Sequence, residues 1–186
     1  VSSDWWQNAK TDMRRFEYRV SRQEISPAKG EPACGLQALN RAHNLKTWFT
    51  ADGVRVGPRS KTAPHWEWGM GLTGWGYEGR TQPVEPVEPL GSGNRVRYER
   101  GNLTEWYIND QRGIEQGFTI AAPPPSEISA SQTTLSFDLK LYGEFETILQ
   151  ENKISFALPQ DGTRVIDLGE FLAIDAKGRN LFTRFS

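Results

Sequence analysis

Paired carboxylates such as Glu105 and Glu115 could in principle carry out catalysis. A pair of carboxyl groups can cleave a glycosidic bond, with one acting as acid and the other as base or nucleophile. The segment 104–108 alternates in polarity, which predicts a strand with Glu105 and Tyr107 on one face and Trp106 on the other. We therefore favour a structural role for Glu105, paired across strands with an arginine, over glycan hydrolysis.

Few other residues could do chemistry. The sequence has two histidines, His43 and His65, and one cysteine, Cys34. No nucleophile elbow of the Gly-x-Ser-x-Gly kind accompanies them, and no spacing typical of zinc ligands or of an EF-hand is present. A single cysteine cannot form an internal disulfide. The sequence predicts no catalytic residue, no cofactor and no metal site, and calcium bound by scattered loop carboxylates stays open.

An aromatic and glycine-rich segment, 64–77, is the best candidate for ligand binding. In an extended chain, even-numbered residues from Trp66 to Leu72 share one face, and Gly69 and Gly71 share the other, where a bulky group can press close. Aromatic rings stack on the apolar faces of sugars, so this segment could form a carbohydrate platform. Its aromatic members are Trp66, Trp68, Trp75 and Tyr77. The alternative, which we favour, is that Trp66 and Trp68 pack in the core.

The N-terminal segment carries two adjacent tryptophans, Trp5 and Trp6. Asp4 is a suitable N-cap, and residues 4–13 lack glycine and proline, so one short helix can begin here. Only one of two adjacent tryptophans can easily face a core. The other is a candidate for contact with a neighbouring chain.

Composition narrows the class of protein. The chain has 186 residues, a net charge of −1 and 37 % hydrophobic residues. The charge balance argues against a nucleic-acid binder that works by bulk charge. No run of 18 apolar residues exists, so no helix is predicted to span a membrane. The 18 glycines and 11 prolines favour a turn-rich fold.

Alternating apolar residues and regularly spaced turns indicate strands. From Asn94 onward turns recur every 8–12 residues, which is typical of a sandwich or barrel. Residues 36–49 combine helix and strand signals. We predict an all-β fold, a two-sheet antiparallel β-sandwich with long loops, forming one domain over 1–186. The proline-rich stretch 81–93 is the best candidate for an internal boundary, between an N-terminal part, 1–80, and a C-terminal sandwich part, 94–186.

Four stretches resemble a known kind of protein domain. They are 37–53, 94–100, 105–119 with the pattern EWYxN…GxEQGFT, and 172–179. Together they are similar to the β-rich N-terminal domain of large secreted bacterial surface proteins, which often carry FG-GAP (integrin-like) β-propeller repeats. The resemblance implies an extracellular or cell-surface β-sandwich without known catalysis.

These observations lead to a ranked expectation about function. The first expectation is a non-catalytic structural or assembly module, secreted with its signal peptide removed, that contacts other protein chains or further domains of the same surface protein. The second is a carbohydrate-binding module that holds polysaccharide on the aromatic segment. A glycan hydrolase is the third. No contact with nucleic acid is expected.

Overall fold

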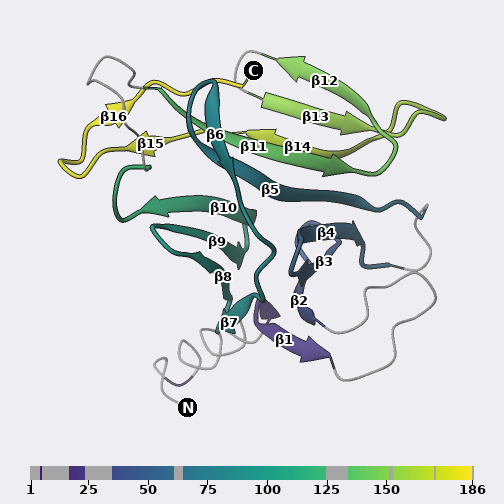
Figure 1. The fold of residues 1–186 in the computed structure, drawn as a ribbon. Helices are drawn as coiled ribbons and strands as arrows, with labels where there is room; N and C mark the ends of the chain where they lie inside the picture. Colours follow the sequence, from purple (N-terminus) through teal and green to yellow (C-terminus); the bar gives the residue numbers. More distant parts are fainter. Residues whose placement is uncertain are drawn as a thin grey trace. The chain divides into compact units, whose positions relative to one another are not determined.

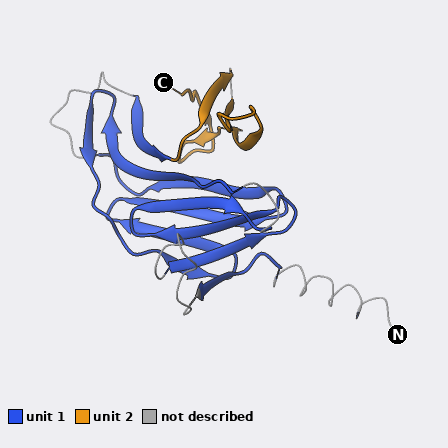
Figure 2. Ribbon diagram, turned by 90° about the vertical axis from the view of Figure 1, so that its right-hand side faces the viewer, with its two compact units in different colours: residues 1–142 blue, residues 143–186 orange. Residues whose placement is uncertain are grey.

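The computed structural model describes residues 5, 17–23, 35–60, 65–124, 134–150, 153–169 and 171–185. It divides the chain into two compact units, Val1–Tyr142 and Gly143–Ser186. Figure 1 labels the strands, and Figure 2 colours unit 1 blue and unit 2 orange. Both units consist of antiparallel strands, which confirms the predicted all-β class.

Unit 1 contains a seven-stranded sheet, here called sheet A. Its strands follow the order β1-β2-β3-β4-β5-β11, with β6 paired to the end of β5. The strands are β1 (Val20–Gln23), β2 (Gly35–Asn40), β3 (Leu45–Thr50), β4 (Gly53–Pro58), β5 (Trp68–Tyr77), β6 (Arg80–Pro83) and β11 (Leu135–Tyr142). The segment 36–49, ambiguous in sequence, is thus a β2–β3 hairpin.

A four-stranded sheet, here called sheet B, covers one face of sheet A. Its order is β10-β9-β8-β7. The strands are β7 (Leu90–Ser92), β8 (Arg95–Arg100), β9 (Leu103–Asp110) and β10 (Gly113–Ile120). Along β9 every second residue is buried, because one face of the strand packs against sheet A while the other faces outward.

The two long sides of this sandwich differ. On one side β1 meets the β7–β8 turn, where the backbone N–H of Val20 donates to the carbonyl of Gly93 (2.8 Å). On the other side run β10 and β11, the terminal strands of sheets B and A. There the rings of Phe118 and Phe137 stack with their centroids 4.5 Å apart. We call this the β10/β11 side.

A β-bulge in β5 determines which residues reach the sandwich interior. Leu72 pairs with Leu139 and Gly74 pairs with the preceding residue of β11, so Thr73 is an extra residue in the ladder. The extra residue reverses the alternation, and Leu72 and Trp75 therefore point to the same side. Both belong to a buried cluster with Leu103 of sheet B.

Unit 2 is a smaller assembly of short strands. A three-stranded sheet comprises β12 (Glu146–Gln150), β13 (Lys153–Ala157) and β14 (Arg164–Gly169), and β15 (Ala173–Ile174) pairs with β16 (Asn180–Leu181). Phe156, Ala157 and Leu158 are buried. Six large apolar side chains of this unit remain exposed: Leu149, Phe171, Leu172, Ile174, Leu181 and Phe182.

Two expectations about organisation concern the N-terminal helix and the internal boundary. Of the helix predicted at 4–13, only Trp5 belongs to the described residues, so this prediction lies outside them. The stretch 81–93 lies within unit 1 and connects sheet A to sheet B through residues without regular structure between β6 and β7. The division between the two compact units falls between Tyr142 and Gly143. That the chain is one domain stays a prediction.

Candidate functional site

Glu105 lies wholly inside the sandwich. Its side chain is inaccessible to solvent, and its Oε1 accepts hydrogen bonds from the Tyr107 hydroxyl (2.7 Å) and from Nε2 of Gln116 (3.1 Å). Its Oε2 lies 3.5 Å from Nη2 of Arg100 on the neighbouring strand β8. Glu105 therefore lies on the same face as Tyr107 and is paired with an arginine of the neighbouring strand, as predicted.

Arg100 joins this interior group to the segment that crosses between the sheets. Its side chain is 6 % exposed, and its Nη1 donates to the backbone carbonyl of Glu85. Arg100 Nε and Glu105 Oε2 have no hydrogen-bond partner among the described residues. A buried ion pair with incomplete hydrogen bonding contributes little net stability, although removing one partner is costly.

Two tyrosines enclose the buried carboxylate. Tyr98 and Tyr107 pack edge to face with centroids 6.1 Å apart, and the Tyr98 hydroxyl donates to the carbonyl of Gly53. Burial, reinforced by the charge of Glu105, raises the pKa of both hydroxyl groups well above the ordinary tyrosine value. Both tyrosines are therefore neutral hydrogen-bonding groups at physiological pH.

Glu115 does not share a site with Glu105. It lies exposed on the outer face of sheet B, opposite Ile108 in the ladder, whereas Glu105 faces inward. Its carboxylate binds Arg112 (3.0 Å). A retaining or inverting pair must flank one bond from a shared cleft. The two glutamates occupy opposite faces of the sheet and do not form such a pair.

A pair of buried asparagines links the two sheets. Asn40, the last residue of β2, donates from Nδ2 to Oδ1 of Asn109 in β9 (2.9 Å) and to the carbonyl of Asp110 (2.7 Å). Asn109 Nδ2 donates to the carbonyls of Tyr18 and Leu39. Both side chains are at most 1 % exposed. They satisfy backbone groups where the strands of both sheets end.

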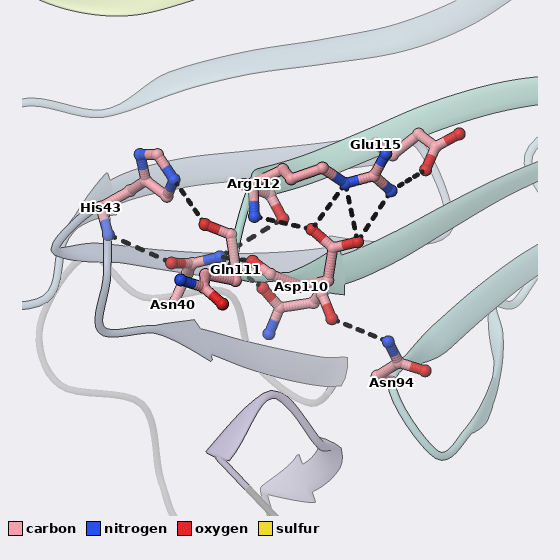
Figure 3. Close-up of polar contacts among 9 residues, drawn as sticks. Asn40, His43, Asn94, Asp110, Gln111, Arg112 and Glu115 are labelled. Atoms are coloured by element: carbon pink, nitrogen blue, oxygen red, sulfur yellow. Dashed lines mark hydrogen bonds and ion pairs between the residues drawn. The ribbon is translucent and has the colours of Figure 1, made fainter. Parts of the chain in front are cut away.

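The adjacent turns form an exposed polar cluster around this pair (Figure 3). His43 Nε2 lies 3.1 Å from the carbonyl of Gln111, which can only accept, so His43 donates through Nε2. Arg112 binds Asp110 (2.8 Å) and Glu115. Hydrogen bonds from Arg112 lower the pKa of the Asp110 carboxyl below its ordinary value. His43 is thus a hydrogen-bonded turn residue.

The predicted aromatic platform is not one exposed surface. Trp68 and Trp75 are 3 % and 8 % exposed and face the sandwich interior, Trp66 and Tyr77 are half-buried, and Trp5 is 57 % exposed. Trp6 lies outside the described residues. The prediction of a bulky group against the glycine face is confirmed, because the side chain of Arg55 covers Gly69. The guanidinium carbon of Arg55 lies 3.7 Å from the centroid of the Tyr142 ring.

Three residues that form contacts in sheet B or between the two sheets were not identified as contact residues from the sequence. Asn40 and Gln116 complete the interior hydrogen bonds, and Trp106 lies against Gly117 on the outer face of sheet B. The pattern EWYxN…GxEQGFT contains the available signal, since its alternation separates the inward Glu105 and Tyr107 from the outward tryptophan. No pattern within one segment could pair Asn40 with a residue of β9.

The described parts of the chain contain neither a cluster of metal-binding side chains nor a membrane-spanning helix. These residues include no group of three or more histidine, cysteine or acidic side chains suited to a metal ion. They also include no helix with the length and apolar character needed to cross a membrane.

Comparison with known proteins does not extend this picture. A scan against protein-family models, a search of curated proteins and a search of solved structures found no match to this chain. The resemblance to secreted bacterial surface domains therefore stays a prediction.

Proposed function

We propose that this protein is a non-catalytic structural module that acts through contacts with other protein chains. Its placement in a secreted or cell-surface bacterial protein, outside the membrane, rests on the sequence resemblance. The observation that carries the proposal is the β10/β11 side. There two eight-residue strands, each the edge strand of its sheet, lie next to each other. The interior position of Glu105, away from Glu115, supports the non-catalytic assignment.

The β10/β11 side is apolar, and beyond β10 and β11 no further strand is paired among the described residues. The inward residues of β10, Ile114, Phe118 and Ile120, are half-buried, unlike the fully buried residues of β9. On β11, Leu135 and Leu141 are 39 % and 45 % exposed. Exposed apolar side chains beside unpaired backbone N–H and C=O groups favour the addition of a further strand.

The occupant we propose is a second copy of this chain, joined through β11. An antiparallel strand can pair with its own copy around a two-fold axis, which gives a closed, self-complementary contact. Such pairing satisfies the edge backbone groups of both copies at once and removes Leu135 and Leu141 from water.

Light scattering over a concentration series tests this proposal. The full chain is expected to show a mass that rises with concentration, and Leu141→Glu is expected to abolish the rise because a buried charge opposes association. Leu90→Glu is the matched control: Leu90 is 46 % exposed but lies on β7, at the opposite side of the sandwich. This control is expected to associate like the unaltered chain.

Two results would overturn the proposal. One is a monomeric mass for the unaltered chain at every concentration. The other is association that Leu141→Glu and Leu90→Glu reduce equally, since that would show a general effect of added charge. Thermal unfolding of each variant verifies that it is folded.

A further inference from the structure

Trp106 lies flat on the outer face of sheet B. It pairs with Gly117 across β9 and β10. A Cβ atom built on Gly117 would lie closest to Cζ2 of the indole, with Cη2 and Cε2 almost equally near at 2.5 and 2.6 Å. An edge-on ring would hold those two flanking carbons clearly farther away than Cζ2. The indole therefore turns its face to the strand, and the absence of a side chain at Gly117 permits this position.

A hydrogen bond fixes the orientation of the ring. Trp106 Nε1 donates to the hydroxyl of Thr119, 3.1 Å away and two residues beyond Gly117 on the same strand. The side chain is half-buried, so part of the indole remains open to solvent. Because Trp106 points away from the interior that contains Tyr107, it takes no part in the buried hydrogen bonds described above. The ring is held in place before any ligand arrives.

Hydrogen-bonding side chains surround the indole. Arg97 is its partner on the other flanking strand, and the guanidinium of Arg95 lies over the indole ring, with its carbon 5.4 Å from the ring centroid. Arg97 binds Glu99 (2.7 Å), and both side chains are about half exposed. Donors and acceptors therefore lie over and beside the indole ring, on the outer face of the same sheet.

We propose that Trp106 is the stacking platform of a carbohydrate-binding site and that its ligand is a pyranose ring of an oligosaccharide. The C–H groups of a pyranose face match the negative face of an indole, and its ring hydroxyls match guanidinium donors and carboxylate acceptors. Arg95 and Arg97 are the groups that contact hydroxyls or a sugar carboxylate, and Glu99 orients Arg97. The site is separate from the β10/β11 contact, because it uses the outward rather than the inward residues of β10.

The shape of the surface favours a sugar over an extended peptide. A peptide strand would pair with the edge of β10, whereas the platform lies on the outer face of the sheet, over β9 and β10. Past Gly117 no further strand of sheet B follows among the described residues, so the platform is open on that flank. A ring of a longer chain can thus lie on the indole while the chain continues past the edge.

Titration calorimetry of the full chain with defined oligosaccharides tests the site. The probes are cellohexaose, xylohexaose and chitohexaose as neutral ligands, and hexagalacturonate as an acidic one. Binding of at least one probe is expected. Trp106→Ala is expected to weaken that binding at least about tenfold, since stacking and its burial are lost.

A second variant separates the platform from folding. Gly117→Ala keeps Trp106 but forces the indole off the strand, so the same loss of affinity is expected with a folded protein. Trp48→Ala is the control, because Trp48 is a half-buried tryptophan of sheet A that contacts Lys46 instead. Its affinity is expected to stay within about twofold of that of the unaltered chain.

The outcomes are distinguishable. A shift of the Trp106 indole N–H resonance on addition of the bound probe supports direct stacking. Absence of binding to all four probes would overturn the proposal, as would binding that Trp106→Ala and Gly117→Ala leave unchanged. A stable fold of each variant is established from its thermal midpoint.

Discussion

The side chains of Asn40 and Asn109 hold the two sheets of unit 1 to each other through a 2.9 Å hydrogen bond. The two residues are far apart in sequence and both are buried. Each also donates hydrogen bonds to buried or partly buried backbone carbonyl groups, which would otherwise lack a partner where the two turns lie close together. The pair therefore couples the positions of the β2–β3 and β9–β10 turns.

Replacing Asn40 with leucine is expected to lower the free energy of unfolding by about 3 kcal/mol. The substitution leaves the Asn109 amide oxygen and the Asp110 carbonyl without their donor in a buried place. Urea unfolding measures the change. The double variant Asn40→Leu/Asn109→Leu is expected to cost less than the sum of the two single variants, because the residues are in contact. Strict additivity would contradict this coupling.

Glu105→Leu is expected to destabilise the fold by about 3–5 kcal/mol. It leaves the guanidinium of Arg100 buried, with only 6 % of that side chain exposed, and without its carboxylate. Arg100→Met added to Glu105→Leu is expected to restore much of the loss, since both charges are then removed. Equilibrium unfolding of the unaltered chain and of the two variants provides the comparison. If the double variant is the least stable of the three, the buried pair is itself a major stabilising contact.

Alkaline pH is expected to destabilise the protein through Tyr98 and Tyr107. Burial raises the pKa of both hydroxyl groups in the folded state, so they stay neutral while the unfolded chain ionises. Their contribution to the free energy of unfolding is complete below the pKa of about 10 that tyrosine has in the unfolded chain. Above that pH the contribution declines by about 1.4 kcal/mol per pH unit for each tyrosine. Unfolding measured between pH 9 and 12 reveals the slope. Tyr98→Phe is expected to remove the part of this slope that one tyrosine contributes. An unchanged slope would show that the Tyr98 hydroxyl does not cause the loss of stability.

Gly71→Ala is expected to be more destabilising than Gly69→Ala. A Cβ atom at Gly71 collides with the backbone carbonyl of Asp52, which cannot easily move, whereas the nearest atoms at Gly69 belong to the flexible side chain of Arg55. The difference is expected to reach about 1 kcal/mol or more. Thermal unfolding of both variants measures it. Equal effects would mean that the turn containing Asp52 adjusts freely.

Local alternation was enough to predict the class of fold and several strands. The apolar row at Phe137 and Leu139 lies inward on β11, and the alternation around Glu105 places that residue on the same face as Tyr107. The β2–β3 hairpin was not predictable, because residues 36–49 combine helix and strand preferences that only pairing with neighbouring strands resolves.

A polarity pattern with a period of two shows that a strand has two different faces, but it does not show which of them another sheet covers. The sequence by itself determined that Trp68 shares a face with Leu72 and that Trp106 opposes Glu105. Only the tertiary structure decided that Trp75 joins the interior, because the extra residue Thr73 reverses the alternation of β5. Tertiary packing likewise buried Trp68 and directed Trp106 to the outer face of sheet B, since sheet B covers one face of sheet A with its inward residues.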